Sequence, residues 1–276
     1  MHAHTFSFEF FPPKTKEGAD KLSTVLAQLG ALKPRYFSVT YGAGGSTRQG
    51  TLDTVLAILA AGFEAAPHLS CIGSSQENIR ALLDEYRALG INHIVALRGD
   101  MPSGLRDPGE FRHATELVKF IRAETGDWFH VEVAAYPEFH PQAISAETDL
   151  DFFQRKVEAG ATAAITQYFY NADAYVRFIE SCAVRGITIP VVPGIMPITN
   201  FTQLARFSDA SGAEIPRWLR KRLESFGDDR AAITAFGLEV VTRLCERLLN
   251  EGAPGLHFYT MNQAEPTATI WQNLGL

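Results

Sequence analysis

One carboxylate stands inside a strongly apolar run near the amino terminus. Glu9 lies in Thr5–Phe11, which reads TFSFEFF and is followed at once by Pro12-Pro13. Alternation along a strand places Glu9 on the face opposite the neighbouring phenylalanines, and the two prolines end the strand. Burial would raise the pKa of this carboxyl above its usual value of about 4.3, which suits a general acid near neutral pH. An ion pair with a lysine at the strand end is the competing interpretation.

A glycine-rich loop follows the second predicted strand. The segment Tyr41–Arg48 reads YGAGGSTR and comes directly after Thr40. Glycines on either side of Ala43 would let backbone N–H groups approach a ligand closely. An ordinary turn between a strand and a helix has the same composition, so the loop alone does not establish a binding site.

Other predicted strands also end in groups that can contact a ligand. Arg98–Asp100 closes the run IVALRGD and brings two charges to a strand end, although a salt bridge within the loop explains them as well. Gln167 has a carboxamide that can donate and accept at the edge of a heterocycle. Phe201 follows another strand, either as an aromatic lid or as a core residue of a short helix.

The loop and helix after the fifth predicted strand combine aromatic and charged side chains. Tyr136 and His140 lie in AAYPEFHPQA, and such rings suit a planar cofactor. The helix that follows carries Asp149, Arg155 and Lys156. Its two adjacent cations could grip a pyrophosphate, whereas a solvated charged face is the more common meaning of such a pair.

Several familiar motifs are missing from the sequence. It has no G-x-G-x-x-G after a strand, no Walker A loop, no H-E-x-x-H and no G-x-S-x-G. Any dinucleotide must therefore be bound without a Rossmann fingerprint. His2 and His4 resemble a metal pair, but they precede the first strand and so lie at the wrong end of it. We therefore expect no metal-binding residues in this chain.

Short apolar runs alternate with amphipathic stretches along the whole chain. Helical spacing of apolar residues predicts helices over Asp20–Leu29, Asn78–Leu89, Glu116–Ala123 and Tyr175–Val184. Gly30, Gly90, Gly160 and Gly186 come after such stretches, where helices commonly end. The predicted strands are Thr5–Phe11, Tyr36–Tyr41, Glu64–Ser70, His93–Arg98, His130–Tyr136, Ala163–Phe169, Pro190–Ile195 and Gly255–Thr260.

This alternation predicts an α/β fold with a parallel sheet. Eight strand–helix units indicate a (β/α)₈ TIM barrel formed by residues 1–276 as one domain. The long interval Phe201–Asn250 must hold extra helices before the eighth strand. An open doubly wound sheet is the second choice. In a barrel the carboxyl ends of all strands meet at one opening, where active sites lie.

Composition excludes some classes of partner. A formal net charge of −6 argues against a surface for nucleic acid or anionic membrane. The three cysteines are far apart and odd in number, which favours a reducing, cytoplasmic location over a disulfide framework. We find no signal peptide and no apolar run long enough to cross a bilayer.

The motifs taken together resemble bacterial-type 5,10-methylenetetrahydrofolate reductases. The matching strings, in chain order, are SFEFFPPK, SVTYGAGGSTR, EAAPHLSC, HIVALRGD, AAYPEFHP, AITQYF, PGIMPITNF and LHFYTMN. They cover nearly the whole chain, and each lies at a predicted strand end or loop. The resemblance implies a TIM barrel that binds FAD. It also implies reduction of 5,10-methylenetetrahydrofolate to 5-methyltetrahydrofolate by NADH or NADPH, in a ping-pong reaction through the flavin.

The resemblance also implies roles for single residues. Glu9 matches the general acid that helps to open the folate ring, and Asp100 matches an aspartate near flavin and folate. Gln167 matches a folate contact, and Phe201 matches an aromatic residue that stacks on the nicotinamide or the folate in turn. The positions that match FAD contacts are Thr40, Tyr41, Ala43, His68, Arg98, Gly99, Asp100, Tyr136, His140, Ala143, Asp149, Arg155 and Lys156.

Two positions depart from the family pattern. Gln263 stands where the family usually carries an arginine near the folate. The neutral amide of glutamine cannot form the charged, two-bond pair that an arginine guanidinium makes with a carboxylate of the folate. Phe152 replaces a polar residue near the FAD contacts. Two alternatives stay open: a metal-dependent barrel hydrolase that uses His2, His4 and His68, and a flavin- or folate-binding paralogue without turnover. The sequence does not choose between NADH and NADPH, and it leaves a homo-oligomer possible.

Overall fold

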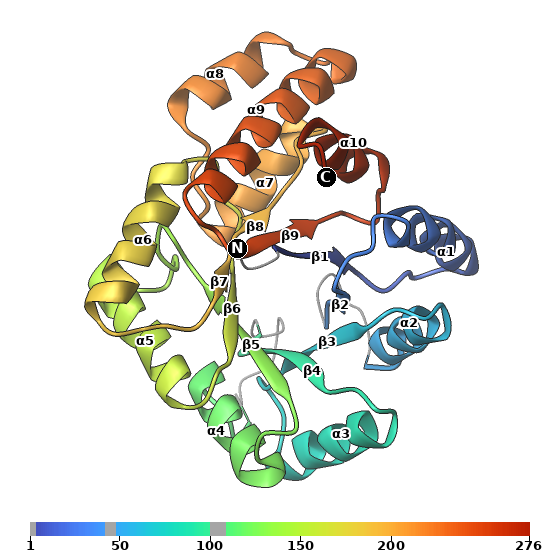
Figure 1. Ribbon diagram of the computed structural model, residues 1–276, viewed down its shortest axis with the longest axis vertical. Helices are drawn as coiled ribbons and strands as arrows, with labels where there is room; N and C mark the ends of the chain where they lie inside the picture. Colours follow the sequence, from blue (N-terminus) through green and yellow to red (C-terminus); the bar gives the residue numbers. More distant parts are fainter. Residues whose placement is uncertain (1–3, 42–47, 100–108) are drawn as a thin grey trace.

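The strands of this chain form one parallel ring. The structure is a computed structural model that describes residues 4–41, 48–99 and 109–276. Within these residues a nine-stranded sheet has the order β7-β6-β5-β4-β3-β2-β1-β9-β8, and helices surround it (Figure 1). The strands are β1 (Thr5–Phe10), β2 (Tyr36–Val39), β3 (Ala65–Ser70), β4 (His93–Leu97), β5 (His130–Ala135), β6 (Ala163–Thr166), β7 (Val191–Val192), β8 (Gly194–Ile195) and β9 (Gly255–Tyr259).

The ring closes through a strand that is broken in two. Strand β7 pairs with β6, whereas β8 pairs with β9 on the other side. Pro193 separates the two pieces, and its carbonyl accepts the N–H of His257. Because β7 and β8 together fill the predicted strand Pro190–Ile195, the described residues form the eight-stranded (β/α)₈ barrel that the sequence predicts. The doubly wound open sheet is wrong.

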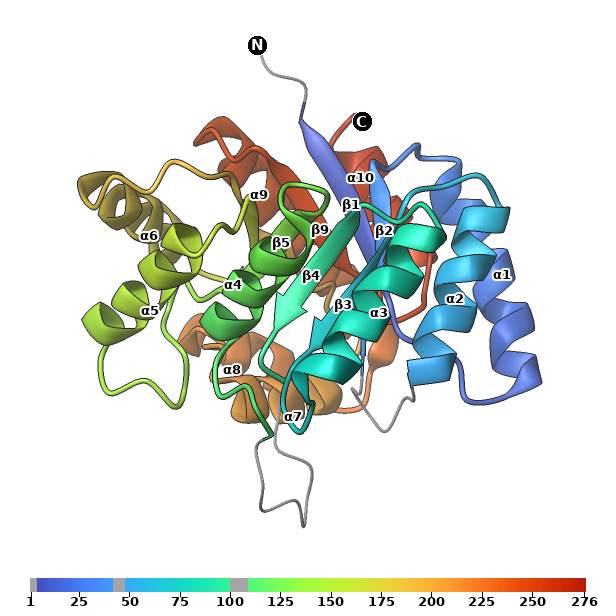
Figure 2. The same cartoon turned by 90° about the horizontal axis from the view of Figure 1, so that it is seen from below.

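The helices occupy the intervals expected for them. All four predicted helices are present as α1, α3, α4 and α6. Each observed helix is longer than the range predicted for it. The long interval before β9 holds α7, α8 and α9. In Figure 2 the strand arrows point downward, and α7 and α8 lie at that lower end. The helices are α1 (Lys16–Gly30), α2 (Arg48–Ala60), α3 (Gln76–Ala88), α4 (Ala114–Thr125), α5 (Ala146–Glu158), α6 (Ala172–Val184), α7 (Phe201–Ser211), α8 (Arg217–Ser225), α9 (Arg230–Asn250) and α10 (Glu265–Asn273).

Gly30 has a different role from the predicted one. It is the last residue of α1 and does not follow the helix. A Cβ atom placed there would lie 2.2 Å from Cζ of Phe63, because the phenyl ring packs directly on the backbone. Glycine is needed at this position for the close approach of a side chain and not to end the helix.

Strand β1 separates an apolar outer face from a polar inner face. Phe8 and Phe10 are fully buried, and Phe8 packs against Phe37, Phe258 and Trp271 of α10. The alternate residues Ser7 and Glu9 contact histidines of β3 and β9. The predicted alternation is therefore confirmed, and it directs the one carboxylate of β1 into the barrel.

Two further expectations concern the chain as a whole. In the described part of the chain, no helix combines the length and the apolar character that a membrane span needs. Cys71, Cys182 and Cys245 are free and buried. Burial raises the pKa of the Cys182 thiol to about 11, which keeps this thiol protonated and unreactive near neutral pH.

Candidate active site

The predicted site residues come from the carboxyl ends of successive strands. Thr40 follows β2, Arg98 and Gly99 follow β4, Tyr136 follows β5, and Gln167 follows β6. Because all these strands are parallel, their carboxyl ends surround one opening of the barrel. Asp100 and Ala43 lie outside the described residues, so their predicted roles stay predictions.

Glu9 lies between two histidines inside this opening. Its Oε2 atom is 3.4 Å from Nε2 of His68 and 3.8 Å from Nε2 of His257, and its side chain is 18% exposed. On the far side of His257, Nδ1 lies 2.7 Å from the hydroxyl oxygen of Ser7. Among the described residues the ionic neighbours of Glu9 are these histidines, so the alternative of a strand-end pair with lysine is wrong.

The surroundings of His68 disfavour a positive charge on this histidine next to Glu9. Burial lowers the pKa of His68, and this effect exceeds the opposing influence of the Glu9 carboxylate. In the described structure Nε2 of His68 and Nε2 of His257 are both buried without a hydrogen-bond partner. Glu9 therefore lies beside one imidazole, that of His68, whose neutral form is favoured and whose Nε2 lies close to the carboxylate.

The turn after β9 holds the end of the Glu9 strand, which the sequence analysis missed. The hydroxyl of Thr260 donates to the carbonyl of Glu9 at 2.7 Å. The side chain of Asn262 accepts from the N–H of Phe11 at 3.0 Å and donates to its carbonyl at 2.8 Å. Asn262 has φ 54°, a left-handed conformation that asparagine tolerates better than most residues. The signal in the sequence is an asparagine three residues after the end of β9.

We expect Asn262→Gly to slow folate reduction about tenfold with little effect on the fold. Glycine tolerates the left-handed backbone of this position. The substitution removes both hydrogen bonds to Phe11, so the end of the Glu9 strand can shift. Small displacements of a catalytic group can lower the rate by ~10²-fold. Steady-state turnover and thermal unfolding measure the two effects. Asn273→Ala is the matched control, because it removes one hydrogen bond of 3.4 Å that Asn273 of α10 donates to the hydroxyl of Thr242 in α9. Unchanged turnover of Asn262→Gly would show that the turn does not position Glu9.

One side of the opening brings together several of the residues predicted to contact a planar cofactor. The rings of Tyr136 and His140 lie 4.7 Å apart in an edge-on arrangement. The N–H of His140 donates to a carboxylate oxygen of Asp149 at 3.0 Å, and the N–H of Ala143 donates to the carbonyl of His140 at 2.8 Å. Arg98 reaches the same loop through the side chain of Gln142 at 2.9 Å.

The two cations of α5 contact different groups. The Lys156 ammonium donates to the carbonyl of Ala134 and lies 5.6 Å from the ring centre of Phe153. Burial lowers the pKa of Lys156 to about 8. The guanidinium of Arg155 instead lies 5.4 Å from the ring of Phe152. The structure does not bring the two cations together, and their joint grip on a pyrophosphate stays a prediction.

The predicted substrate contacts lie near the start of α7 and the end of β6. The Gln167 side chain accepts the N–H of Tyr168 at 2.9 Å, which leaves its NH₂ group to donate elsewhere. Phe201 is the first residue of α7 and is half-buried, with the guanidinium of Arg220 5.9 Å from its ring centre. Gln263 is exposed and lines a small hollow with Asn200 and Thr260.

Comparison with known proteins identifies the family. The family model for methylenetetrahydrofolate reductase matches residues 1–275. The chain belongs to this family. It is 41% identical over 271 residues to the 5,10-methylenetetrahydrofolate reductase of Escherichia coli K12, covering 98% of this chain and 90% of that protein. A probable NADH-dependent methylenetetrahydrofolate reductase of rice is 39% identical over 285 residues, covering 98% of this chain and 48% of that protein.

The fold also has a solved counterpart. A Clostridium thermocellum protein, described as binding two copies of 5-methyl-5,6,7,8-tetrahydrofolic acid, matches with a TM-score of 0.72 at 16% identity. The match covers 99% of this chain and 95% of that one. At this identity the likeness supports the fold alone, and it agrees with the TIM barrel.

The chain is thus an oxidoreductase with methylenetetrahydrofolate reductase activity, an enzyme of folate one-carbon metabolism and methionine biosynthesis. The alternative of a metal-dependent hydrolase is wrong. Its ligands do not converge, because His4 lines a cavity at the amino end of the barrel whereas His68 contacts Glu9 at the carboxyl end. His2 lies outside the described residues. The family match also decides against a paralogue without turnover.

Proposed function

We propose that this reductase transfers hydride from NADH or NADPH to 5,10-methylenetetrahydrofolate through FAD bound at the carboxyl end of the barrel. Glu9 is the general acid in this proposal, and residues 1–276 form one catalytic domain. The two substrates use the same opening in turn, in a ping-pong reaction. When bound, the flavin supplies the chemistry of accepting a hydride from one substrate and passing it to the other.

The position of Glu9 carries the proposal. Opening the five-membered ring of the folate requires a proton at the nitrogen that leaves. Glu9 is a mostly buried carboxyl in the opening, next to neutral His68 and to His257. The neutral form of His68 is favoured, and its Nε2 lies 3.4 Å from the Glu9 carboxylate, so we assign to Glu9 the delivery of the proton to the substrate. General acids placed in this way accelerate reactions by about 10²–10⁴-fold.

The residues around the opening fit a flavin dinucleotide. The hydroxyl of Thr40 is buried and, within the described structure, has no hydrogen-bond partner, so it can bond a ligand. Gly99 has φ 82°, and a Cβ atom there would lie 1.9 Å from Oγ of Ser70. Only glycine fits this position between the strand end and Ser70. We assign the FAD contacts to Thr40, Tyr41, Ala43, His68, Arg98, Gly99, Asp100, Tyr136, His140, Ala143, Asp149, Arg155 and Lys156.

The folate contacts are proposed for the other side of the opening. Gln167 offers its NH₂ group, Phe201 offers a half-buried ring, and Gln263 offers a neutral amide in an exposed position. The Clostridium thermocellum protein of similar fold is described as binding a methylated tetrahydrofolate, which supports a folate site in such a barrel. A cytoplasmic location and a possible homo-oligomer complete the proposal.

Separated half-reactions test this function. The purified protein is expected to be yellow, to lose its absorbance near 450 nm when NADH is added without oxygen, and to regain it when methylenetetrahydrofolate follows. Stopped-flow absorbance measures both steps, and the same protocol with NADPH determines the preferred donor. A colourless protein that cannot be reconstituted with FAD would contradict the cofactor assignment. A bleached flavin that folate fails to reoxidise would contradict the substrate assignment.

A further inference from the structure

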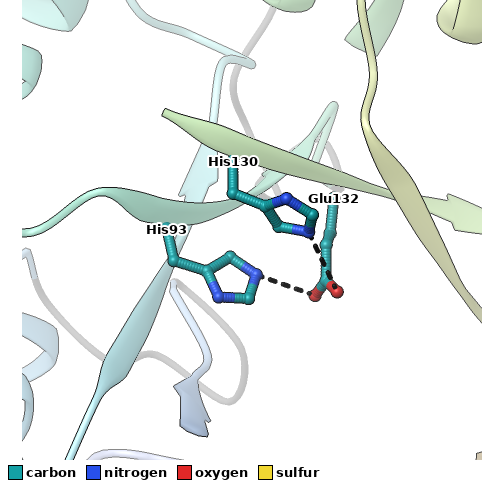
Figure 3. A group of neighbouring side chains, drawn as sticks. All are labelled: His93, His130 and Glu132. Atoms are coloured by element: carbon teal, nitrogen blue, oxygen red, sulfur yellow. Dashed lines mark ion pairs between the residues drawn. The ribbon is translucent and has the colours of Figure 1, made fainter. Parts of the chain in front are cut away.

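Two histidines and a glutamate meet at the end of the barrel opposite the active site. His93 and His130 are the first residues of β4 and β5 and pair directly across the sheet, and Glu132 is two residues further along β5. Figure 3 shows both rings turned toward the carboxylate of Glu132. Nε2 of His93 lies 3.3 Å from Oε2 of Glu132, and Nε2 of His130 lies 3.8 Å from Oε1.

These distances suit a small divalent cation. The three ligand atoms all lie within 4.8 Å of one another. A tetrahedral zinc ion with bonds of about 2.0–2.2 Å separates its ligand atoms by about 3.3–3.6 Å. The contacts of Glu132 with His93 and His130, at 3.3 and 3.8 Å, are near this spacing. An inward movement of the half-exposed His130 ring would complete the geometry.

The threonine next to His130 orients its imidazole ring. The hydroxyl of Thr162 lies 3.1 Å from the carbonyl oxygen of Val131 and accepts the N–H of Val131 at 2.8 Å. Nδ1 of His130 lies 3.1 Å from the same hydroxyl oxygen. This contact holds the ring through Nδ1 and leaves Nε2 facing the carboxylate of Glu132. Metal-binding histidines are oriented by a contact of this kind on their second nitrogen.

The other two members are deeply buried. His93 is 8% exposed and Glu132 is 3% exposed. Although Nε2 of His93 lies close to Glu132, it has no hydrogen-bond partner within the described residues. Tyr36 donates its hydroxyl hydrogen to Oε2 of Glu132 at 2.6 Å and holds that carboxylate in place. Two imidazole nitrogens and a buried carboxylate thus face one point, where a cation would compensate the charge of the carboxylate.

We propose that His93, His130 and Glu132 bind one divalent transition-metal ion, with Zn²⁺ as the best match to two imidazoles and a carboxylate. The three residues line an open cavity of about 1390 Å³, from which water can supply the fourth ligand. The ion joins the start of β4 to the start of β5. It lies at the amino end of the barrel. Residues at this end of a TIM barrel usually contribute to stability, whereas catalytic residues lie at the carboxyl end.

Metal analysis of the tag-free enzyme tests this site. After chelation and equilibration with Zn²⁺, about one ion per chain is expected, together with a higher unfolding temperature. Replacement by Co²⁺ should give the visible absorption of a tetrahedral ion. His130→Gln and Glu132→Gln should weaken Zn²⁺ binding by at least ~100-fold, because each removes a ligand. His130 is half-exposed, so this variant is expected to fold normally, and circular dichroism verifies it.

His4→Gln is the matched control, because His4 lines the same cavity but is not part of the cluster. It should bind Zn²⁺ like the unaltered enzyme, and reductase activity should be the same in His130→Gln and in the unaltered enzyme. Binding of much less than one Zn²⁺ per chain, when free Zn²⁺ is in micromolar excess over the enzyme, would overturn the proposal. A protonated histidine would then be the cation that faces Glu132. Equal loss of binding in His4→Gln, or full binding in His130→Gln, would also overturn it.

Discussion

Replacing Glu9 by glutamine is expected to slow the reduction of methylenetetrahydrofolate by about 10²–10⁴-fold while NADH still bleaches the flavin at nearly the original rate. Glutamine has the same shape and can still face His68 and His257, so the opening keeps its form. It has no acidic proton to give to the folate nitrogen. Only the second half-reaction needs that proton, so only that half-reaction should suffer.

Stopped-flow absorbance of each half-reaction measures this difference. Ser38→Ala is the matched control: Ser38 pairs with Glu9 across β1 and β2, is fully buried, and lacks a hydrogen-bond partner for its hydroxyl among the described residues. Its removal should leave both half-reactions unchanged. If Glu9→Gln reduced folate at the rate of the unaltered enzyme, Glu9 would not be the acid. If it lost flavin reduction as well, Glu9 would have a structural role.

Replacing Phe8 by alanine is expected to lower the free energy of unfolding by about 3–5 kcal/mol. Phe8 is completely buried on the outer face of β1, and its ring centre lies 5.7 Å from Phe37, 5.9 Å from Phe258 and 6.0 Å from Trp271. Alanine leaves a cavity between the sheet and α10 that these rigid rings cannot fill. Urea unfolding followed by circular dichroism measures the loss.

Phe11→Ala provides the comparison within the same segment. Phe11 is 38% exposed and comes just after β1 ends, so its removal should cost about 1 kcal/mol or less. Similar costs for the two substitutions would mean that the aromatic cluster between β1 and α10 is not the main support of this strand. A cost confined to Phe8 would show that packing behind the strand holds Glu9 in its position.

The parts of the fold that could be predicted are those with a local signal. Glu9 among phenylalanines shows the period of two that defines a strand with one polar face, and this was sufficient to place it inside the barrel. Regular alternation of strands and helices fixed the order of the strand ends around the opening. Thr40, Arg98, Tyr136 and Gln167 therefore lie where expected, each directly after its strand.

The features that could not be predicted depend on contacts between distant segments. Asn262 binds Phe11, 251 residues earlier, and no periodicity connects the two. His93, His130 and Glu132 converge only because β4 and β5 pair in a particular register. The direction of the Lys156 side chain also follows from tertiary packing, since Ala134 and Phe153 supply its contacts. A helical wheel gives the face of such a residue but not its partner.

The break at Pro193 makes the wall of the barrel uneven. β7 and β8 are each two residues long, whereas the other strands have four to six residues, so fewer ladder hydrogen bonds can form at this joint. The joint leads directly into Met196 and the start of α7, beside the hollow lined by Gln263. The barrel wall is thus least continuous beside the entrance that, in our proposal, the nicotinamide donor and the folate use in turn.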